Sequence, residues 1–266
     1  MRFASLGSGS RGNALVVEAE AEGRCTRVLL DCGFGPRELA QRLARLGLAP
    51  EDLDAIVLTH EHSDHSAGVL ACARRQQIEV FLTHGTLGAM SAMGAAGSGA
   101  IAALTTLRVI ASDLAFSIGA LQIQPFPVPH DAREPVQYVF SDSRHRLGVL
   151  TDAGAATPHM RAMLDGCDAL VLECNHDEQM LARGAYPWPL KQRIAGPYGH
   201  LANDAAAALL ATLARPRLQH LVAAHLSEQN NTPLLARGAL AAAGGYGEER
   251  IVVASQEEGF SWLEME

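Results

Sequence analysis

Four side chains that commonly bind metal ions lie within six residues in the segment THEHSDH: His60, His62, Asp64 and His65. The segment directly follows the apolar run 55–58, whose β-branched residues predict a buried strand. In an extended chain, side chains two residues apart point the same way, so His60 and His62 can bind one cation. Asp64 and His65 fall where the chain turns into a helix and can face a second cation. Burying four such polar groups without partners would be costly, so their spacing predicts a metal site.

Three more polar side chains each follow an apolar run that predicts a strand. They are His130, Asp152 and His225, which follow the runs 121–125, 147–150 and 221–224. A single histidine is more often structural, but side chains at the carboxyl ends of strands converge on one site in α/β proteins. We therefore expect these three residues to complete the metal site.

This ligand set predicts a hydrolase that uses two divalent metal ions per chain. Two ions about 3.5 Å apart lower the pKa of a bridging water, supply hydroxide at neutral pH and neutralise charge on the attacked group. Imidazole and carboxylate ligands suit zinc or manganese, and also iron. The residue types leave the choice among these metals open.

The elements expected around the site alternate between strands and helices, which predicts an α/β fold, called α+β in some schemes. Strands are expected at 1–6, 14–18, 27–30, 55–58, 78–82, 121–125, 137–141, 147–151, 169–173, 221–224 and 251–254. Helices are expected at 36–47, 66–77, 158–165, 203–214 and 232–243, and partly within the Ala-, Gly- and Met-rich segment 86–104. Asn203 is expected to be the N-cap of its helix.

Composition limits the class of protein. The 266 residues are 48% hydrophobic and contain no Pro-rich linker or long apolar run, which predicts one domain over residues 1–266, no membrane span and a cytoplasmic location. The five cysteines form no CxxC pair, which argues against a disulfide framework and a zinc ribbon. The net charge of −8 does not by itself indicate a nucleic-acid binder.

The ordered set of an early Asp31, the HxHxDH segment, His130, Asp152 and His225 resembles the metallo-β-lactamase superfamily over nearly the whole chain. The resemblance implies a four-layer αββα sandwich. It also implies the ligands of each ion: His60, His62, His130 and Asp152 for one, and Asp64, His65, His225 and the bridging Asp152 for the other. Asp31 would orient the ligands from behind. A turn-forming role before Gly33 is the alternative.

Two residues outside this set resemble a pair in the tRNA 3′-processing branch of the superfamily. They are Glu173, in LVLECNHD, and His200, in GHLAND. Carried over, Glu173 would orient His200, and His200 would protonate the departing sugar oxygen. A phosphodiester needs such an acid because an alkoxide is a poor leaving group, whereas a thiolate leaves unaided. A turn role is the alternative for His200, and His176 is expected to support the ligands from behind.

Longer segments resemble the bacterial YycJ/WalJ-like exonuclease family. They are SGSRGN, LTHEHSDHSAG, LECNHD, GAYPWPLKQRIAGPYGHLAND and HLSEQNNTP, with Ala202 where the family usually has Ser. The resemblance implies a metal-dependent 5′-exonuclease acting on DNA, with repair as its expected context. Asp64 would then count among the catalytic residues as well as the ligands.

Residues expected to contact DNA flank these motifs. Ser10, Arg11 and Asn13 could hold a terminal phosphate, and Arg183, Lys191 and Arg193 could bind the backbone. Tyr186 and Trp188 could stack on a base. A solvated surface position, or packing within the loop, is the alternative for each.

Two other functions of the same fold stay open. One is a small-molecule thioester or lactone hydrolase, which the acidic net charge favours. The other is a mononuclear iron oxidoreductase, against which the presence of both Asp64 and His225 weighs. No stable protein partner is expected.

Overall fold

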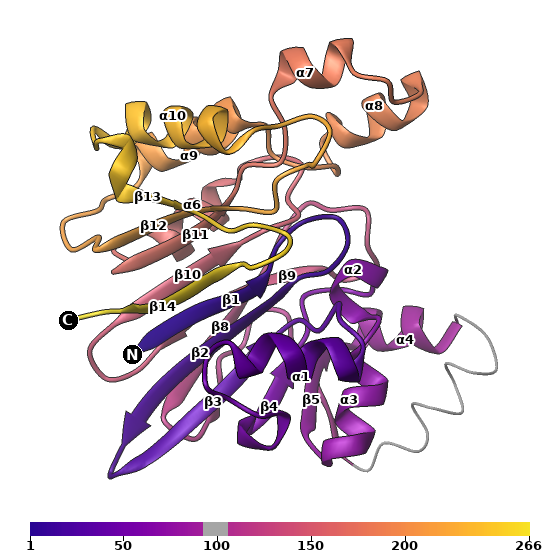
Figure 1. Ribbon diagram of the computed structural model, residues 1–266, viewed down its shortest axis with the longest axis vertical. Coiled ribbons are helices and arrows are strands. Elements are labelled where there is room, and N and C mark those ends of the chain that lie inside the picture. Colours follow the sequence, from indigo (N-terminus) through magenta and orange to yellow (C-terminus); the bar gives the residue numbers. More distant parts are fainter. Residues whose placement is uncertain (93–105) are drawn as a thin grey trace.

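The computed structural model describes residues 1–92 and 106–266, and in these ranges it has two seven-stranded sheets (Figure 1). The first sheet has the order β14 (Phe260–Glu264), β1 (Arg2–Gly7), β2 (Ala14–Ala21), β3 (Arg24–Leu30), β4 (Ala55–Val57), β5 (Glu79–Thr83) and β6 (Leu107–Ile110). The second has the order β13 (Ile251–Val253), β12 (His220–Ala224), β11 (Ala169–Glu173), β10 (Arg146–Leu150), β9 (Val136–Ser141), β8 (Leu121–Pro127) and β7 (Phe116–Ile118).

Each sheet changes from antiparallel to parallel pairing part of the way across. In the first sheet, β14, β1, β2 and β3 pair antiparallel, whereas β3 to β6 are parallel. In the second, β7 to β10 pair antiparallel, and β10 to β13 are parallel. Parallel strands end at the same edge of their sheet, so the residues that follow β3 and β4, and those that follow β10, β11 and β12, are brought together.

Helices cover the outer face of each sheet (Figure 1). The helices in the described ranges are α1 (Pro36–Ala44), α2 (Ser63–Ser66), α3 (Val69–Gln76), α4 (His84–Ala92), α6 (Pro158–Leu164), α7 (Glu178–Arg183), α8 (Trp188–Ile194), α9 (Asn203–Thr212) and α10 (Pro233–Gly244), with 3₁₀ turns at Pro50–Asp52 and Glu248–Arg250. Helices α7 and α8 do not cover a sheet but project beyond the sheets as an arm, the α7–α8 arm (Figure 1). None of the helices in these ranges is long and apolar enough to cross a membrane.

Three separate hydrophobic cores account for the layers. The first lies between the sheets and includes Phe3, Val28, Tyr138 and Val171. The second packs α1 and α3 onto the first sheet, and the third packs α6, α9 and α10 onto the second. Two sheets buried on both faces explain why most strands read as continuous apolar runs. The expected four-layer αββα sandwich of the α/β class is confirmed.

The sequence-based elements differ from the structure in a few places. Asn203 was expected to be an N-cap, which is wrong: Ala202 is the N-cap of α9, and the Asn203 side chain exchanges hydrogen bonds of 2.9 and 2.8 Å with Asn231. That buried amide pair ties the start of α9 to the chain before α10. Strands β6, β7 and β14 and helices α7 and α8 were not anticipated. Of the expected helix at 86–104, the part at 93–105 lies outside the described residues.

Three loops interlock at the edge where the parallel strands end. The backbone N–H of Asn13 donates to the carbonyl of Asp64 at 2.7 Å, and that of Cys32 donates to the carbonyl of His65 at 2.8 Å. Gly33 lies between these loops, and a Cβ added there would lie 2.0 Å from the Asp64 carbonyl oxygen. Only a glycine allows the three loops to approach this closely.

We predict that Gly33→Ala lowers the free energy of unfolding by about 1–3 kcal/mol, because the new methyl group must displace the Asp64 backbone. Gly35→Ala is the matched control, since no atom lies within 4 Å of its added Cβ and its φ is −63°. It should cost less than about 1 kcal/mol. Chemical denaturation measures both values, and equal losses in the two variants would contradict the close-packing argument.

Candidate metal centre

Left-handed backbone turns follow three of the parallel strands. Asp31 follows β3 with φ 60°, Asp152 follows β10 with φ 51°, and His225 follows β12 with φ 55°. Residues other than glycine rarely adopt this conformation, and it costs about 1–3 kcal/mol where it occurs. Only five non-glycine residues in the described ranges have positive φ, and three of them are predicted site residues. The strained turns are therefore concentrated where the chain leaves the sheets and enters the site.

The seven predicted ligands come together at this edge. Potential ligand atoms within 4.8 Å of one another form four overlapping groups. The groups are His60, His62 and His130; His60, His65 and Asp152; Asp64, His65 and His225; and Asp152, Glu173, His200 and His225. The first and third groups match the two halves of the expected dinuclear site. Asp152 and His65 connect those halves.

Close approaches between ring nitrogens and carboxylate oxygens define the geometry. His130 Nε2 lies 3.2 Å from His62 Nδ1. His65 Nε2 lies 3.0 Å from Asp152 Oδ2 and 3.3 Å from Asp64 Oδ2. His225 Nε2 lies 3.4 Å from Asp64 Oδ2. These atoms all point into one space.

Hydrogen bonds behind the histidines hold the rings in this orientation. His65 Nδ1 donates to Asp31 Oδ2 at 2.8 Å, and the hydroxyl and backbone N–H of Thr59 also donate to Asp31. His130 Nδ1 donates to the carbonyl of Gly199 at 3.0 Å. With Nδ1 acting as the donor, Nε2 of each ring presents its lone pair to the shared space. Asp31 therefore does more than form a turn, and Thr59 is a contributor that sequence reasoning missed.

The buried charges of the cluster favour the binding of cations. Burial would raise the pKa of Asp152, but the neighbouring His225 and His65 lower it well below its usual value. Burial would lower the pKa of His65, but the charges of Asp152, Asp31 and Asp64 raise it well above its usual value. Burial lowers the pKa of His60, and the charge of His65 lowers it further, so its imidazole is neutral.

Two buried polar atoms that form no hydrogen bond within the described part of the chain test whether metal ions fit this site. His60 Nε2 and Asp152 Oδ2 are buried and form no hydrogen bond among the described residues, and the ring nitrogen His65 Nε2 lies 3.0 Å from Asp152 Oδ2. Leaving such groups unpaired costs about 1–3 kcal/mol each. A divalent cation accepts lone pairs from both atom types and supplies the positive charge that the carboxylates require. The donor set therefore fits divalent metal ions.

Glu173 and His200 form a hydrogen-bonded pair beside this cluster. His200 Nδ1 donates to Glu173 Oε1 at 2.8 Å, and His225 Nδ1 lies 3.1 Å from the same oxygen. The other carboxylate oxygen, Oε2, accepts from the backbone N–H groups of Ala153 and Leu201, both at 3.0 Å. Glu173 is fully buried, whereas 22% of the His200 side chain is exposed. Burial lowers the pKa of His200, but the charge and hydrogen bond of Glu173 raise it above its usual value.

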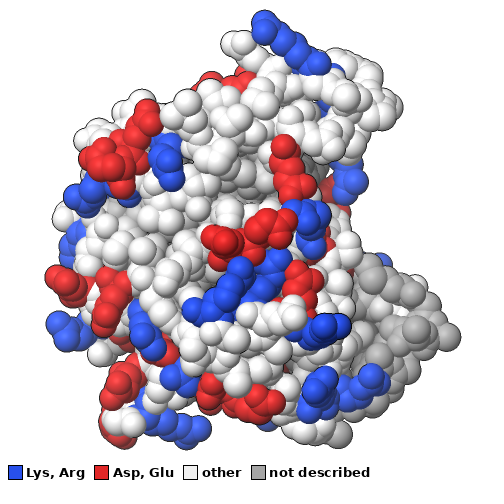
Figure 2. Space-filling view, viewed as in Figure 1, with Lys and Arg blue, Asp and Glu red and all other residues white. Residues whose placement is uncertain are grey.

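A cleft of about 370 Å³ opens over the site, and we call it the metal cleft. It is lined by residues of the cluster and by the arm that carries α7 and α8: Ser10, His62, Ser63, Asp64, Asp131, Asp152, Tyr186, Leu190, Arg193, Ile194, Gly199, His200 and His225. In the space-filling view, this arm overhangs the edge of the molecule, and Lys/Arg and Asp/Glu side chains are interspersed across the face shown (Figure 2).

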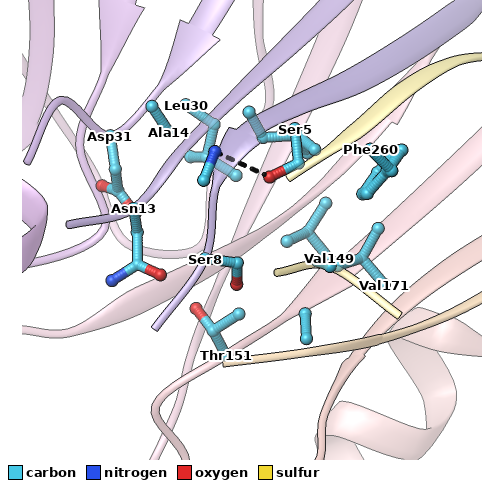
Figure 3. Close-up of a pocket in the computed structure, with 14 residues that line it drawn as sticks. Ser5, Ser8, Asn13, Ala14, Leu30, Asp31, Val149, Thr151, Val171 and Phe260 are labelled. Atoms are coloured by element: carbon cyan, nitrogen blue, oxygen red, sulfur yellow. Dashed lines mark hydrogen bonds between the residues drawn. The ribbon is translucent and has the colours of Figure 1, made fainter. Parts of the chain in front are cut away.

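A small cavity of about 30 Å³ lies between the sheets, next to the loops that carry Asp31 and Asn13 (Figure 3). One end is apolar, with Val149, Val171 and Phe260, and the other is polar, with Ser8 and Thr151. It has room for about two water molecules. Ser8 Oγ also accepts from the backbone N–H of His225 at 2.9 Å, so this polar end supports a site loop.

The residues of the first loop occupy different environments. Arg11 is exposed and pairs with Glu228 and Glu257, at 2.6 Å from the former. Asn13 is buried, and its amide nitrogen donates to the carbonyl of Gly9 at 3.0 Å and to Asp64 Oδ2 at 3.2 Å. Ser10 lines the metal cleft. Asn13 thus holds the Asp64 loop, and Ser10 is the one of the three predicted phosphate contacts that faces the cleft.

The predicted basic contacts lie on the α7–α8 arm. Arg183 is exposed at the end of α7, and Lys191 Nζ donates to the carbonyl of Ala182 at 2.7 Å. Arg193 lines the metal cleft and bonds Asp131. Asp131 Oδ1 lies 3.6 Å from His130 Nε2, so this pair joins the arm to the metal ligands. Sequence reasoning missed Asp131, although its place next to His130 was a signal.

We predict that divalent metal ions stabilise the fold through this cluster. At about 1,000 times its Kd, a bound ion contributes roughly 4 kcal/mol, which corresponds to a rise in Tm of about 10 °C for a chain of this size. Differential scanning fluorimetry with Mn²⁺ or Zn²⁺, and with EDTA to reverse the effect, measures it. His65→Ala should lose more than half of the rise, while His84→Ala, an exposed histidine at the start of α4, should keep all of it. A full rise in His65→Ala would contradict the assignment.

Comparisons with known proteins agree with this geometry. The family model described as "Beta-lactamase superfamily domain" matches residues 26–225. The exodeoxyribonuclease YycJ of Bacillus anthracis is 33% identical over 237 residues, which cover 89% of this chain and 86% of that protein. The exodeoxyribonuclease WalJ of Streptococcus pneumoniae is 34% identical over 236 residues, which cover 88% and 85%.

Among solved structures, the zinc-bound protein PqqB of Methylobacterium extorquens superposes with a TM-score of 0.71 over 100% of both chains. The two sequences are 19% identical, so this likeness concerns the fold. The family match over residues 26–225 includes all seven predicted ligands, from His60 to His225. The chain therefore belongs to the metallo-β-lactamase superfamily, in which it is a YycJ/WalJ-like metal-dependent hydrolase.

Proposed function

We propose that this protein is a dinuclear metal-dependent phosphodiesterase, a 5′-exonuclease acting on DNA. The observation that carries the proposal is the Glu173–His200 pair, because it places a proton donor beside a cluster fit for metal ions. A phosphodiester requires such a donor, since its leaving alkoxide is strongly basic. A thioester does not, so the pair favours the nuclease over the thioester hydrolase.

We propose for the two ions the ligand sets that the superfamily resemblance implies, and the groups of converging atoms support them. His60, His62, His130 and Asp152 would hold one ion, and Asp64, His65, His225 and the bridging Asp152 would hold the other. Zinc and manganese both suit this set. Bound there, two divalent ions would supply hydroxide at neutral pH and the positive charge that a phosphodiester anion requires.

The chain's own residues would carry the remaining roles. Glu173 accepts from His200 Nδ1, so the free Nε2 of His200 would hold the proton for the departing oxygen. Ser10 and Arg193 line the metal cleft and would contact phosphate oxygens near the attacked group. Asp131 would hold Arg193 in place for that contact.

DNA as the substrate is supported by the two exodeoxyribonucleases to which the chain is similar along most of its length. The net charge of −8 does not oppose this choice, because the interspersed surface charges leave no single acidic field over the face in Figure 2. Three basic side chains of the arm would contact the phosphate backbone: Arg193, which lines the metal cleft and bonds Asp131, Arg183, which is exposed at the end of α7, and Lys191, which also donates to the carbonyl of Ala182.

We predict that His200→Ala loses at least about 100-fold in kcat on DNA, because general acid catalysis contributes roughly 10²–10⁴-fold. On bis(p-nitrophenyl) phosphate, whose leaving group departs without a proton, the same variant should lose far less. End-labelled single- and double-stranded DNA with Mn²⁺ or Zn²⁺ gives the first rate and the direction of cleavage. Metal content serves as the control that the ligands are intact.

Equal losses on DNA and on the chromogenic diester would contradict the role of His200 as the acid. Turnover of a glutathione thioester without any cleavage of DNA would select the thioester hydrolase instead. A single iron per chain on metal analysis would select the oxidoreductase.

A further inference from the structure

A second pocket lies on the opposite side of α8 from the metal cleft, and we call it the side pocket. It has a volume of about 590 Å³ and is lined by Gly154, His176, Glu178, Leu181, Ala182, Trp188, Lys191, Gln192, Ala195, His200, Ala202 and Ala205. Its size lies within the range of small-molecule pockets, roughly 300–1,000 Å³. The proposed function does not use this pocket.

Helix α8 separates the two spaces. One of its faces, with residues 188, 191, 192 and 195, lines the side pocket at the i, i+3, i+4, i+7 spacing of a helix. The other face, with residues 190, 193 and 194, lines the metal cleft. His200 lines both spaces.

The position of His200 decides which part of a substrate reaches the side pocket. Its Nδ1 is bonded to Glu173, so the departing oxygen must lie against its other nitrogen. The attacked phosphorus lies on the metal-cleft side of that oxygen. The group on the other side of the departing oxygen then extends past His200. It enters the side pocket, because His200 lines both the metal cleft and the side pocket.

The lining of the side pocket suits a nucleoside. Trp188 is 68% exposed and offers an aromatic face for stacking. His176 is 2% exposed, and its only side-chain hydrogen bond among the described residues joins Nδ1 to Asn175 Oδ1 at 3.3 Å, which leaves Nε2 for a base edge. The charged residues of the lining, Glu178 and Lys191, balance each other. One anion and one cation in the lining suit a sugar and base with a single terminal phosphate near Lys191, rather than a run of phosphates.

We propose that the side pocket binds the 5′-terminal nucleoside of the DNA, whose 3′ oxygen is the leaving group; this inference rests on the proposed exonuclease function. In the step, the oxygen of water bonds to phosphorus, the bond from phosphorus to O3′ breaks, and His200 transfers its proton to O3′. The products are a released unit with a free 3′ hydroxyl and a shortened strand with a 5′ phosphate. The size of the pocket would thereby limit the removed unit to one nucleotide.

The test compares two single-stranded oligonucleotides that differ only at the 5′-terminal position, which carries either thymidine or its abasic tetrahydrofuran analogue. The wild type with Mn²⁺ should remove the thymidine unit with a kcat/KM about tenfold higher, a ratio in keeping with the loss of one base-stacking contact. Trp188→Ala, and Ala195→Trp, which fills the pocket from an exposed position, should bring the ratio close to one. The two rates of each ratio are measured on the same preparation of a variant, so a fraction of misfolded protein lowers both rates equally and does not change the ratio.

Two exposed residues of the same arm that do not line the side pocket provide matched controls. Ala185→Trp and Tyr198→Ala should keep the wild-type ratio. A wild-type ratio near one, or an unchanged ratio in Ala195→Trp, would overturn the side-pocket assignment while the exonuclease stands. Absence of cleavage of both oligonucleotides by the wild type would overturn the proposed function itself, and the assignment with it.

Discussion

Buried imidazoles and carboxylates at one edge of the sandwich set the constraint on which the rest of the structure depends. His60 Nε2 is enclosed without a hydrogen-bond partner among the described residues, and the buried carboxylates around it raise the pKa of His65 and His225. Such a cluster is stable only if positive charge sits within it. The fold encloses these groups, and bound divalent cations would supply the charge. The stability of the fold and its hydrolytic chemistry would therefore both depend on the same bound cations.

Strained turns at the ends of strands in both sheets position the residues of this cluster. Asp31, Asp152 and His225 leave parallel strands in the left-handed region, which directs Asp152 and His225 into the shared space and Asp31 onto the ring of His65 behind it. The turn at Asp31 is braced by the loops of Asn13 and Asp64, through backbone hydrogen bonds and the close contact at Gly33. Cores on both faces of each sheet hold the strand ends in place. Rigidity of the scaffold allows the site residues to remain in unfavourable backbone conformations.

Helix α8 adds a second level of organisation to a fold that many hydrolases share. It separates the metal cleft from the side pocket, and its Arg193 joins it to Asp131 beside the metal ligands. His200 stands where the two spaces meet. A fold-level likeness to PqqB, at 19% identity, carries no information about such details. In the proposed function, this arm rather than the sandwich selects the substrate.

Much of the site could be read from the sequence, because its key features are local. The spacing of His60, His62, Asp64 and His65 after a strand, and polar residues directly after apolar runs, follow from the periodicity of extended chain and from the shared edge of parallel strands. Short or half-exposed elements such as α8 and β14 lack a clear period, and so they escaped notice. The bonds of Asn13 to Asp64, Asn203 to Asn231 and Asp131 to Arg193 join residues 28 to 62 positions apart. Only the packed chain brings such partners together, because no local pattern encodes a contact between distant loops.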